Sequence, residues 1–254
     1  MKGRIQLWKK LRQLTDLSLS FIYPEICQLC EAQPAGPKEG YVCHPCRERA
    51  GGIRFIVPPF CDRCGLPFEG DITGDFECAN CHDLKLHFLK SRSSVRTSNM
   101  ILDVIHRYKY QRHLWFESLL VDLLEQVVRQ QFDLSCIDLI TPIPLHKTKK
   151  HKRGFNQAER LGKKLAKRLN VPFLPRTLER IRPTETQTRL TRKMRIQNVL
   201  NAFGPGIQIN QVKNLRVLLI DDIMTTGATA SACAKILKKH KASCITVTTI
   251  SRGV

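Results

Sequence analysis

The last third of the chain alternates short apolar runs with one long amphipathic segment. Residues 216–221, "RVLLID", and 244–251, "CITVTTIS", are the apolar runs, and residues 228–241, "ATASACAKILKKHK", lie between them. Neither run alternates apolar with polar side chains, which is typical of strands that are buried on both faces. Strand, helix and strand in succession indicate parallel pairing. The pattern therefore predicts an α/β domain with a parallel sheet flanked by helices.

The middle of the chain carries apolar residues at helical spacing. Residues 99–131 predict two helices with a break near 110–113, and residues 155–170 predict a third helix that ends at Asn170. Residues 136–145, "CIDLITPIPL", predict a short buried strand that runs into a proline-flanked loop. These elements extend the α/β pattern toward the N-terminus.

The first 26 residues combine early positive charge with a helical apolar pattern. Ile5, Trp8, Leu11 and Leu14 recur every three residues, as on one face of an amphipathic helix. Charged residues interrupt the segment, and it falls short of the roughly 20 apolar residues that a membrane helix needs. We expect a cytoplasmic protein whose first helix packs on its own body, with docking at the inner membrane surface as the alternative.

Eight of the eleven cysteines form four Cys-x2-Cys pairs, and the two halves have nearly the same spacing, with twelve residues between Cys30 and Cys43 and thirteen between Cys64 and Cys78. Two such pairs complete a tetrahedral thiolate shell for Zn²⁺, and four cysteines leave no open position for chemistry. The sequence therefore predicts two structural zinc ions. The predicted ligands are Cys27, Cys30, Cys43, Cys46, Cys61, Cys64, Cys78 and Cys81.

The spacing leaves the pairing of these cysteines open. In-order pairing closes shorter loops than an interleaved cross-brace, which favours it modestly. Disulfides are a further alternative, but they require an oxidising compartment, and the sequence has no recognisable secretory signal.

The net charge of +20 is concentrated in the C-terminal part of the chain. From Thr141 onward there are 24 Lys and Arg against 5 Asp and Glu, whereas residues 1–140 hold 18 against 17. Such a field attracts nucleic acid or phosphorylated small molecules, and the alternative is a solvated surface. The candidate DNA-binding residues are Lys147, Lys149, Lys150, Lys152, Arg189, Arg192, Lys193 and Arg195. The few aromatic candidates for stacking on bases are Tyr108, Tyr110 and Phe155.

Residues 217–229, "VLLIDDIMTTGAT", carry the clearest chemical signal. In a parallel sheet, ligands bind at the carboxyl ends of strands, where the next helix presents free N–H groups. Asp221 and Asp222 stand at that end, and the Thr-Thr-Gly-Ala-Thr turn leads into the helix. A ribose 5-phosphate fits this pattern, because its hydroxyls donate to the carboxylates while its phosphate lies in the turn. The plainer alternative is a helix-capping turn, and the Walker and dinucleotide glycine patterns do not occur.

This stretch resembles the phosphoribosyl pyrophosphate (PRPP) loop of type I phosphoribosyltransferases. The four cysteine pairs, "IHRYKY" (105–110), "RGFNQAERLGKKLAKRL" (153–169) and "TQTRLTRKMRIQNVLNAF" (186–203) precede it in the order typical of the ComF family, ComFC-like competence proteins. The resemblance covers nearly the whole chain. It implies three parts: an N-terminal helical segment (1–26), a zinc-binding domain (27–90) and a phosphoribosyltransferase-like domain (91–254).

The resemblance also implies a ligand set and a chemistry. Asp221 and Asp222 would bind the ribose hydroxyls, and the loop "TPIPLHK" after the predicted strand would bind pyrophosphate together with Mg²⁺. The complete set of expected PRPP-binding residues is Asp221, Asp222, Met224, Thr225, Thr226, Gly227, Ala228, Thr229, Pro144 and Leu145. Catalysis would rest on Asp221, Asp222 and Arg153, with Arg153 neutralising the leaving pyrophosphate. Residues 176–198 are polar, basic and weakly periodic, which predicts a long mobile loop able to close over the site.

Three functions are compatible with these features. The first is a PRPP-binding competence protein that handles single-stranded DNA during uptake. The second is an active phosphoribosyltransferase that transfers the sugar to an unidentified acceptor and releases pyrophosphate, and no acceptor-binding residue can be assigned. The third is an interaction protein whose zinc modules dock onto DNA-uptake proteins.

Overall fold

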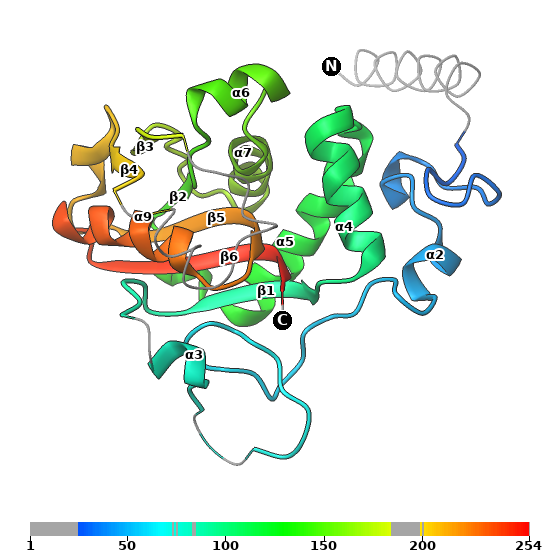
Figure 1. Ribbon diagram of the computed structural model, residues 1–254, viewed down its shortest axis with the longest axis horizontal. Helices are drawn as coiled ribbons and strands as arrows, with labels where there is room; N and C mark the ends of the chain where they lie inside the picture. Colours follow the sequence, from blue (N-terminus) through cyan, green and yellow to red (C-terminus); the bar gives the residue numbers. More distant parts are fainter. Residues whose placement is uncertain are drawn as a thin grey trace, which may run out of the picture.

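A computed structural model describes residues 25–72, 74, 76–82, 85–183, 199 and 201–253 of the 254-residue chain. Four parallel strands form the central sheet in the order β1-β6-β5-β2 (Figure 1). Their bounds are β1 Ser91–Arg96, β2 Leu139–Pro142, β5 Arg216–Met224 and β6 Cys244–Arg252. The predicted parallel α/β fold is therefore confirmed.

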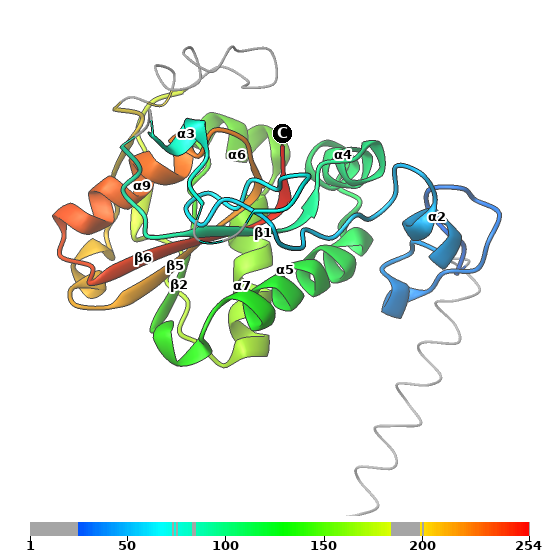
Figure 2. The same cartoon turned by 90° about the horizontal axis from the view of Figure 1, so that it is seen from below.

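Helices cover both faces of the sheet. On one face, α5 packs on β1 and β6, and α7 packs on β2 and β5, whereas α9 covers β5 and β6 from the other face (Figure 2). These helices are α5 Glu117–Gln131, α7 Gln157–Leu169 and α9 Ala228–Lys239, with α4 Asn99–His106 beside α5.

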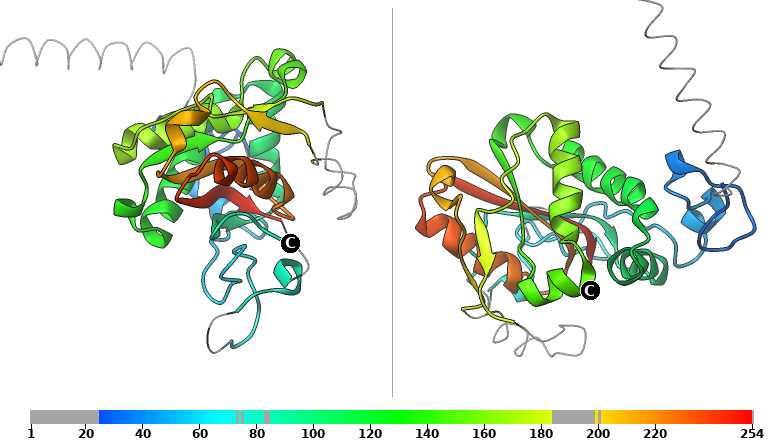
Figure 3. Two further views of the ribbon diagram at one scale, coloured as in Figure 1. Left: turned by 90° about the vertical axis from the view of Figure 1, so that its left-hand side faces the viewer. Right: turned by 90° about the horizontal axis from the view of Figure 1, so that it is seen from above.

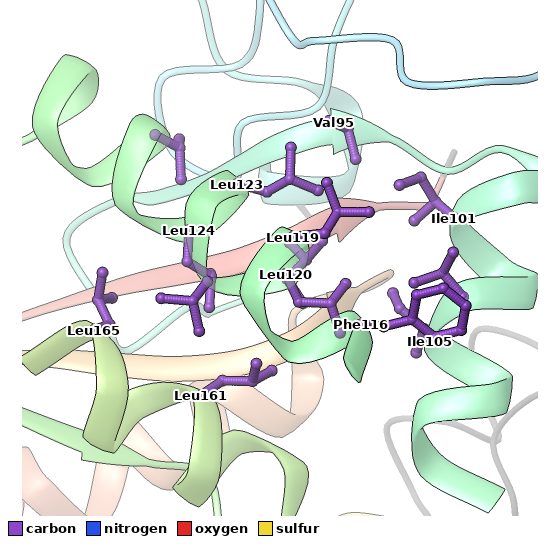
Figure 4. Packing of buried hydrophobic residues seen from close by; sticks show 14 of the residues in the cluster. Val95, Ile101, Ile105, Phe116, Leu119, Leu120, Leu123, Leu124, Leu161 and Leu165 are labelled. Atoms are coloured by element: carbon purple, nitrogen blue, oxygen red, sulfur yellow. The ribbon is translucent and has the colours of Figure 1, made fainter. Parts of the chain in front are cut away.

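The strand β5 shows why its apolar run does not alternate. Leu218 and Ile220 belong to the core beneath α5 and α7, while Val217 and Leu219 belong to the core beneath α9. All four side chains are at most 1% exposed. Figure 4 shows the first of these cores, in which leucines of α5 and α7 meet Val95 of β1 and residues of α4. Burial on both sides therefore explains the pattern from which the fold was predicted.

The two cysteine modules join different faces of the sheet. Cys27, Cys43 and Cys46 share the core of α4, α5 and α7, whereas all four cysteines of the second module share the core of α9. The short helix α2, His44–Glu48, belongs to the first module, and α3, Ala79–His82, belongs to the second. Figures 1 and 2 show them on separate sides of the molecule. Each module is thus continuous with the core of the sheet.

The structure adds several elements that the sequence pattern did not indicate. Strand β1 is polar in sequence but buried, and β3 and β4 form a small antiparallel ribbon next to α9 (Figure 3). The lysine-rich segment after β2 is a helix, α6. The bounds of the added elements are α6 Lys147–Arg153, β3 Leu178–Arg180, β4 Phe203–Pro205, and the short turns η1 Pro37–Glu39, η3 Leu114–Phe116, η4 Leu134–Cys136 and η6 Ile209–Val212.

The predicted break between the two helices of residues 99–131 is present. Between α4 and α5 the chain makes a π-helical turn, η2 Arg107–Gln111, and Arg112 then adopts a left-handed conformation with φ 58°. The expected N-terminal helix and most of the expected loop at 176–198 lie outside the described residues. Among the helices that are described, none has the length and apolar character needed to cross a membrane.

Candidate ribose-phosphate site and zinc centres

A cavity of about 370 Å³ opens at the carboxyl end of β5. The ten residues expected to bind PRPP, from Pro144 and Leu145 after β2 to the turn before α9, all line it. Because β2 and β5 are parallel neighbours, the segments that follow them emerge at the same edge of the sheet. The structure thus brings together the two loops that the sequence singled out, and their binding role stays a prediction.

The turn between β5 and α9 is shaped for an anion. Gly227 has φ 76° and caps α9, and the N–H of Ala228 donates to the Thr226 hydroxyl at 3.3 Å. A Cβ on Gly227 would lie 2.7 Å from Cε of Met224, so a larger residue would meet strain and collision together. The first N–H groups of α9 have no partner within the helix and carry its positive dipole end. Such a turn can hold a phosphate group.

The two carboxylates above this turn have a cationic neighbour that we did not expect. The Lys109 ammonium forms an ion pair with the Asp222 carboxylate, and the two side chains are only 15% and 6% exposed. Burial raises the pKa of Asp222, but the attraction of Lys109 and a hydrogen bond with Asp221 outweigh it and hold that pKa below its usual value. Burial and the charge of Asp222 raise the pKa of Asp221 well above its usual value. Asp222 is therefore the charged hydrogen-bond acceptor of the pair, and Asp221 is the more easily protonated carboxylate.

Lys109 reaches the site because η2 turns it there. On either side of it, Tyr108 is buried and donates from its hydroxyl to Glu117 at 2.8 Å, and Tyr110 lies under the Arg153 guanidinium, 4.9 Å from the ring centre. A helix repeats every 3.6 residues, so the wider π-turn redirects the side chain that sits between the tyrosines. The motif "IHRYKY" was the sequence signal, but no role could be read from it.

Arg180 of β3 also lines the cavity and was not among the expected site residues. Burial lowers its pKa, and the charge of Asp221 partly offsets that effect. Lys109 and Arg180 are thus cations of the cavity that were not among the expected site residues, and they line it together with Asp221 and Asp222. Both come from segments remote in sequence from the PRPP-like loop.

A buried asparagine fixes the loop after β2. Asn156 donates to the Ile143 carbonyl at 3.1 Å and accepts from the N–H of Ala158 at 3.1 Å, so one side chain holds the loop and caps α7. The expected catalytic residue Arg153 is not among the residues that line the cavity. It bonds Gln157 and stacks on Tyr110, both of which do line it.

The expected DNA-binding lysines of α6 are divided between different environments. Lys147 pairs with Glu179 at 3.0 Å and Lys150 with Glu159 at 2.9 Å. Lys149 lines the cavity, where burial lowers its pKa, and Lys152 is exposed. The other four candidates, Arg189, Arg192, Lys193 and Arg195, lie outside the described residues. Of the aromatic candidates, Tyr108 is buried and cannot stack on a base.

The eight paired cysteines form two quartets, Cys27/Cys30/Cys43/Cys46 and Cys61/Cys64/Cys78/Cys81. In each quartet all four sulfur atoms lie within 4.8 Å of one another. The pairing is therefore in order, as modestly favoured, and not interleaved.

The sulfur geometry fits zinc. Neighbouring sulfurs are 3.7 Å apart between Cys30 and Cys43, and 3.6 Å apart between Cys64 and Cys78. A tetrahedron of sulfurs about 2.3 Å from a central Zn²⁺ has edges of about 3.8 Å. Backbone N–H groups also donate to the Cys27 and Cys61 sulfurs, which stabilises thiolates. No disulfide joins the described cysteines. Two structural zinc ions are consistent with this geometry.

We expect metal analysis of the purified protein to find two zinc ions per chain. Replacing Cys46 or Cys78 by serine should reduce the content to about one, because each variant disables a single quartet. Native mass spectrometry measures both values directly. A fully folded wild-type protein without zinc would contradict the expectation.

Comparison with known proteins gives two family matches. Residues 18–83 match the model of a double zinc ribbon domain, and residues 156–253 match that of a phosphoribosyl transferase domain. The first contains both quartets, and the second runs from the cap of α7 through β6. The matched segments thus coincide with the two kinds of site described above.

Whole-chain relatives carry related names. Competence protein F of Haemophilus influenzae is 30% identical over 216 residues, which cover 84% of this chain and 90% of that protein. DNA utilization protein YhgH of Salmonella typhimurium is 28% identical, covering 90% of this chain and 97% of that protein. Competence protein ComFC of Bacillus subtilis is 25% identical, and the match covers 91% of this chain and 97% of that protein.

Proposed function

The chain belongs to the ComF family of competence proteins, and on this premise we propose that it binds PRPP and handles single-stranded DNA in the cytoplasm during DNA uptake. Relatives of similar length are named for competence and for the use of DNA. The zinc modules and the phosphoribosyltransferase domain serve this function together. We keep the division into residues 1–26, 27–90 and 91–254 as part of the proposal.

The observation that supports PRPP binding is that one cavity is lined both by the carboxylates of Asp221 and Asp222 and by the turn of residues 225–229, which we call the phosphate turn. Asp222 is charged and buried, so it is a strong acceptor for the ribose hydroxyls. The left-handed turn at Gly227 and the positive dipole end of α9 would receive the 5′-phosphate. Mg²⁺ prefers oxygen ligands and usually binds through one or two carboxylates plus phosphates, so it would neutralise the pyrophosphate of the ligand.

Titration with PRPP and Mg²⁺ tests this proposal. A ligand that binds only the folded protein at 100 times its Kd stabilises it by about 2.7 kcal/mol, and we expect a rise in melting temperature that saturates with PRPP. Ribose 5-phosphate should give a smaller rise, and glucose 6-phosphate, which lacks the furanose ring, serves as the control. Equal shifts with all three would contradict a ribose-specific site.

An active phosphoribosyltransferase is the alternative function of the same cavity. Lys109 and Arg180 bring positive charge to the place where pyrophosphate would leave. Pyrophosphate release in the presence of PRPP, Mg²⁺ and a panel of nucleobases tests it. Release that depends on one acceptor supports the enzyme, and PRPP binding without release supports a ligand site.

For single-stranded DNA we propose a second surface, beside α9. A cavity of about 640 Å³ there has an apolar floor that includes Leu86, Phe203 and Ile236. Its charged rim consists of Lys85, Lys235, Lys238 and Lys239, and no carboxylate is among the described residues that line it. A nucleotide matches this combination, because its base is a planar apolar face and its phosphate is an anion.

The position of this second cavity supports a joint function. Ala228, at the start of α9, lines both cavities, so they meet at the first turn of that helix. A strand bound beside α9 would lie next to the proposed ribose-phosphate site. The α6 lysines fit DNA less well, because Lys147 and Lys150 already have acidic partners.

Charge-matched variants test the choice of surface. Replacing Lys235, Lys238 and Lys239 by glutamine should weaken single-stranded DNA binding and lower the slope of log K against log salt by about 2, since each phosphate contact contributes about 0.7. The same change at Lys147, Lys150 and Lys152 is the control and should alter the slope little. Fluorescence anisotropy at several salt concentrations measures both, and an effect confined to the α6 variant would overturn the choice of surface.

A further inference from the structure

Arg252, near the end of β6, is a large charged side chain inside the molecule. It is 2% exposed, and among the described residues it forms no ion pair with a carboxylate. A buried guanidinium is costly unless its charge and its donors are matched. The hydrogen-bond partners of the Arg252 side chain therefore indicate its role.

One side of the Arg252 guanidinium faces the second cysteine quartet. Nε donates to the Cys64 carbonyl at 3.2 Å, and Nη2 donates to the Cys64 sulfur at 3.4 Å. Four thiolates carry more negative charge than one Zn²⁺ neutralises, so a loaded quartet is anionic. The second quartet with its zinc ion would thus supply the counter-charge that no carboxylate of the described residues provides.

The other side of the guanidinium holds the start of the phosphate turn. Nη1 donates to the carbonyls of Met224, at 3.3 Å, and of Thr225, the first residue of the turn. Nη1 also donates to the Gly253 carbonyl at 2.6 Å. The N–H of Gly253 in turn donates to the Met224 carbonyl at 2.8 Å. One side chain therefore connects a zinc ligand with the backbone that leads into the turn.

Packing also connects the second cysteine quartet with the turn before α9. A Cβ placed on Gly227 would lie 3.6 Å from the Phe88 ring and 3.7 Å from Leu86. The segment that follows the second quartet therefore packs against the turn. The Ser91 hydroxyl donates to the Met224 sulfur at 2.9 Å. The first quartet, in contrast, belongs to the core on the opposite face of the sheet.

We infer that Arg252 is a positioning residue that couples the second zinc centre to the phosphate turn. The loaded quartet Cys61/Cys64/Cys78/Cys81 fixes Arg252, and Arg252 fixes the Thr225 carbonyl so that the following N–H groups face the cavity. This inference rests on the proposed ribose-phosphate site. Because coupling between two sites is reciprocal, ligand in the turn also strengthens zinc binding at the second quartet and leaves the first unchanged.

The first test uses the full wild-type chain and does not measure activity. Zinc release to a chromogenic chelator is followed with and without ribose 5-phosphate, in the absence of Mg²⁺. We expect ribose 5-phosphate to slow the release of one of the two zinc ions, and the Cys46→Ser variant, which keeps only the second, to retain the effect. If ribose 5-phosphate changes the release rate of neither zinc ion, the inference is overturned.

The second test replaces Arg252. Arg252→Gln should weaken ribose 5-phosphate binding about tenfold or more, within the roughly 5–150-fold range of coupled sites, and should speed release of the second zinc only. Arg252→Lys keeps the charge and should recover part of both properties. Arg216→Gln, at the opposite end of the neighbouring strand, is the matched control.

The outcomes separate the inference from the function on which it rests. Wild-type protein that fails to bind ribose 5-phosphate in calorimetry refutes the proposed site itself. Wild-type binding that is unchanged in a folded Arg252→Gln variant refutes only the coupling. If Arg252→Gln does not fold, the zinc-release measurement on the wild-type chain still decides.

Discussion

Replacing Asp222 by asparagine is expected to weaken PRPP binding by roughly 10- to 150-fold, because a hydrogen bond to a charged group contributes about 1.5–3 kcal/mol. The change removes the charge of the carboxylate that we propose as the acceptor of the ribose hydroxyls. It also leaves the Lys109 ammonium buried without its partner, which adds to the cost. Isothermal titration calorimetry with PRPP and Mg²⁺ measures the loss.

Asp221→Asn should have a smaller effect than Asp222→Asn. The raised pKa of Asp221 means that its carboxyl is the more readily neutral of the pair, and asparagine resembles a neutral carboxyl in size and polarity. Glu69→Gln, an exposed carboxylate paired with Arg96, changes the net charge equally and is the control. An Asp221→Asn loss that exceeds the Asp222→Asn loss would reverse the assignment of the charged acceptor.

Replacing Glu117 by glutamine is expected to lower the free energy of unfolding by about 3 kcal/mol. Its side chain is 2% exposed and accepts from Arg160 at 2.7 Å and from Tyr108 at 2.8 Å, with Lys164 as a further partner. Removing one member of a buried ion pair costs about 3–5 kcal/mol. The lower end applies because Arg160 and Lys164 are 40% and 54% exposed and can turn to water.

Urea denaturation measures this loss, and Glu125→Gln on the same helix is the matched control. Glu125 pairs with Arg129 and Arg168 at the surface, so its change should cost at most about 1 kcal/mol. Equal losses in the two variants would show that burial of Glu117 adds nothing. Because Glu117 also accepts from Tyr108, its loss should disturb η2 and with it Lys109.

The pH dependence of stability follows from the same cluster. Burial raises the pKa of Glu117, but hydrogen bonds from Arg160, Lys164 and Tyr108 outweigh it, so the folded pKa lies below its usual value. The stabilisation is therefore complete above the unfolded pKa of about 4.3 and is lost as the pH falls through the folded pKa. Glu117→Gln should flatten the stability profile in that acidic range.

The elements that were predicted correctly share a local cause. The cysteine pairs repeat a spacing that zinc geometry demands, and β5, α9 and β6 carry patterns set by burial on the faces of each element. The PRPP-like stretch is likewise contiguous, because strand end, turn and helix start follow one another in the chain. For such features, the sequence neighbours are also the neighbours in space.

The residues that were missed act through contacts between distant segments. Strand β1 is buried although it reads "SRSSVR", because several of its polar side chains find partners on distant segments: Ser93 bonds Thr249 of β6 at 2.6 Å, and Ser91 donates to Met224 of β5 at 2.9 Å. Lys109 meets Asp222 from 113 positions away. Local patterns contain no information about such pairs.

The sequence by itself determined the fold class, the eight paired cysteines and the contiguous residues 221–229 that line one cavity, because local spacing and periodicity encode them. Only the tertiary structure decided the in-order cysteine quartets and their attachment to opposite faces of the sheet. It also decided that Lys109 balances Asp222 and that Arg252 links Cys64 to Thr225. The physical reason is that a buried charge needs a partner, and the folded chain selects that partner by proximity in space.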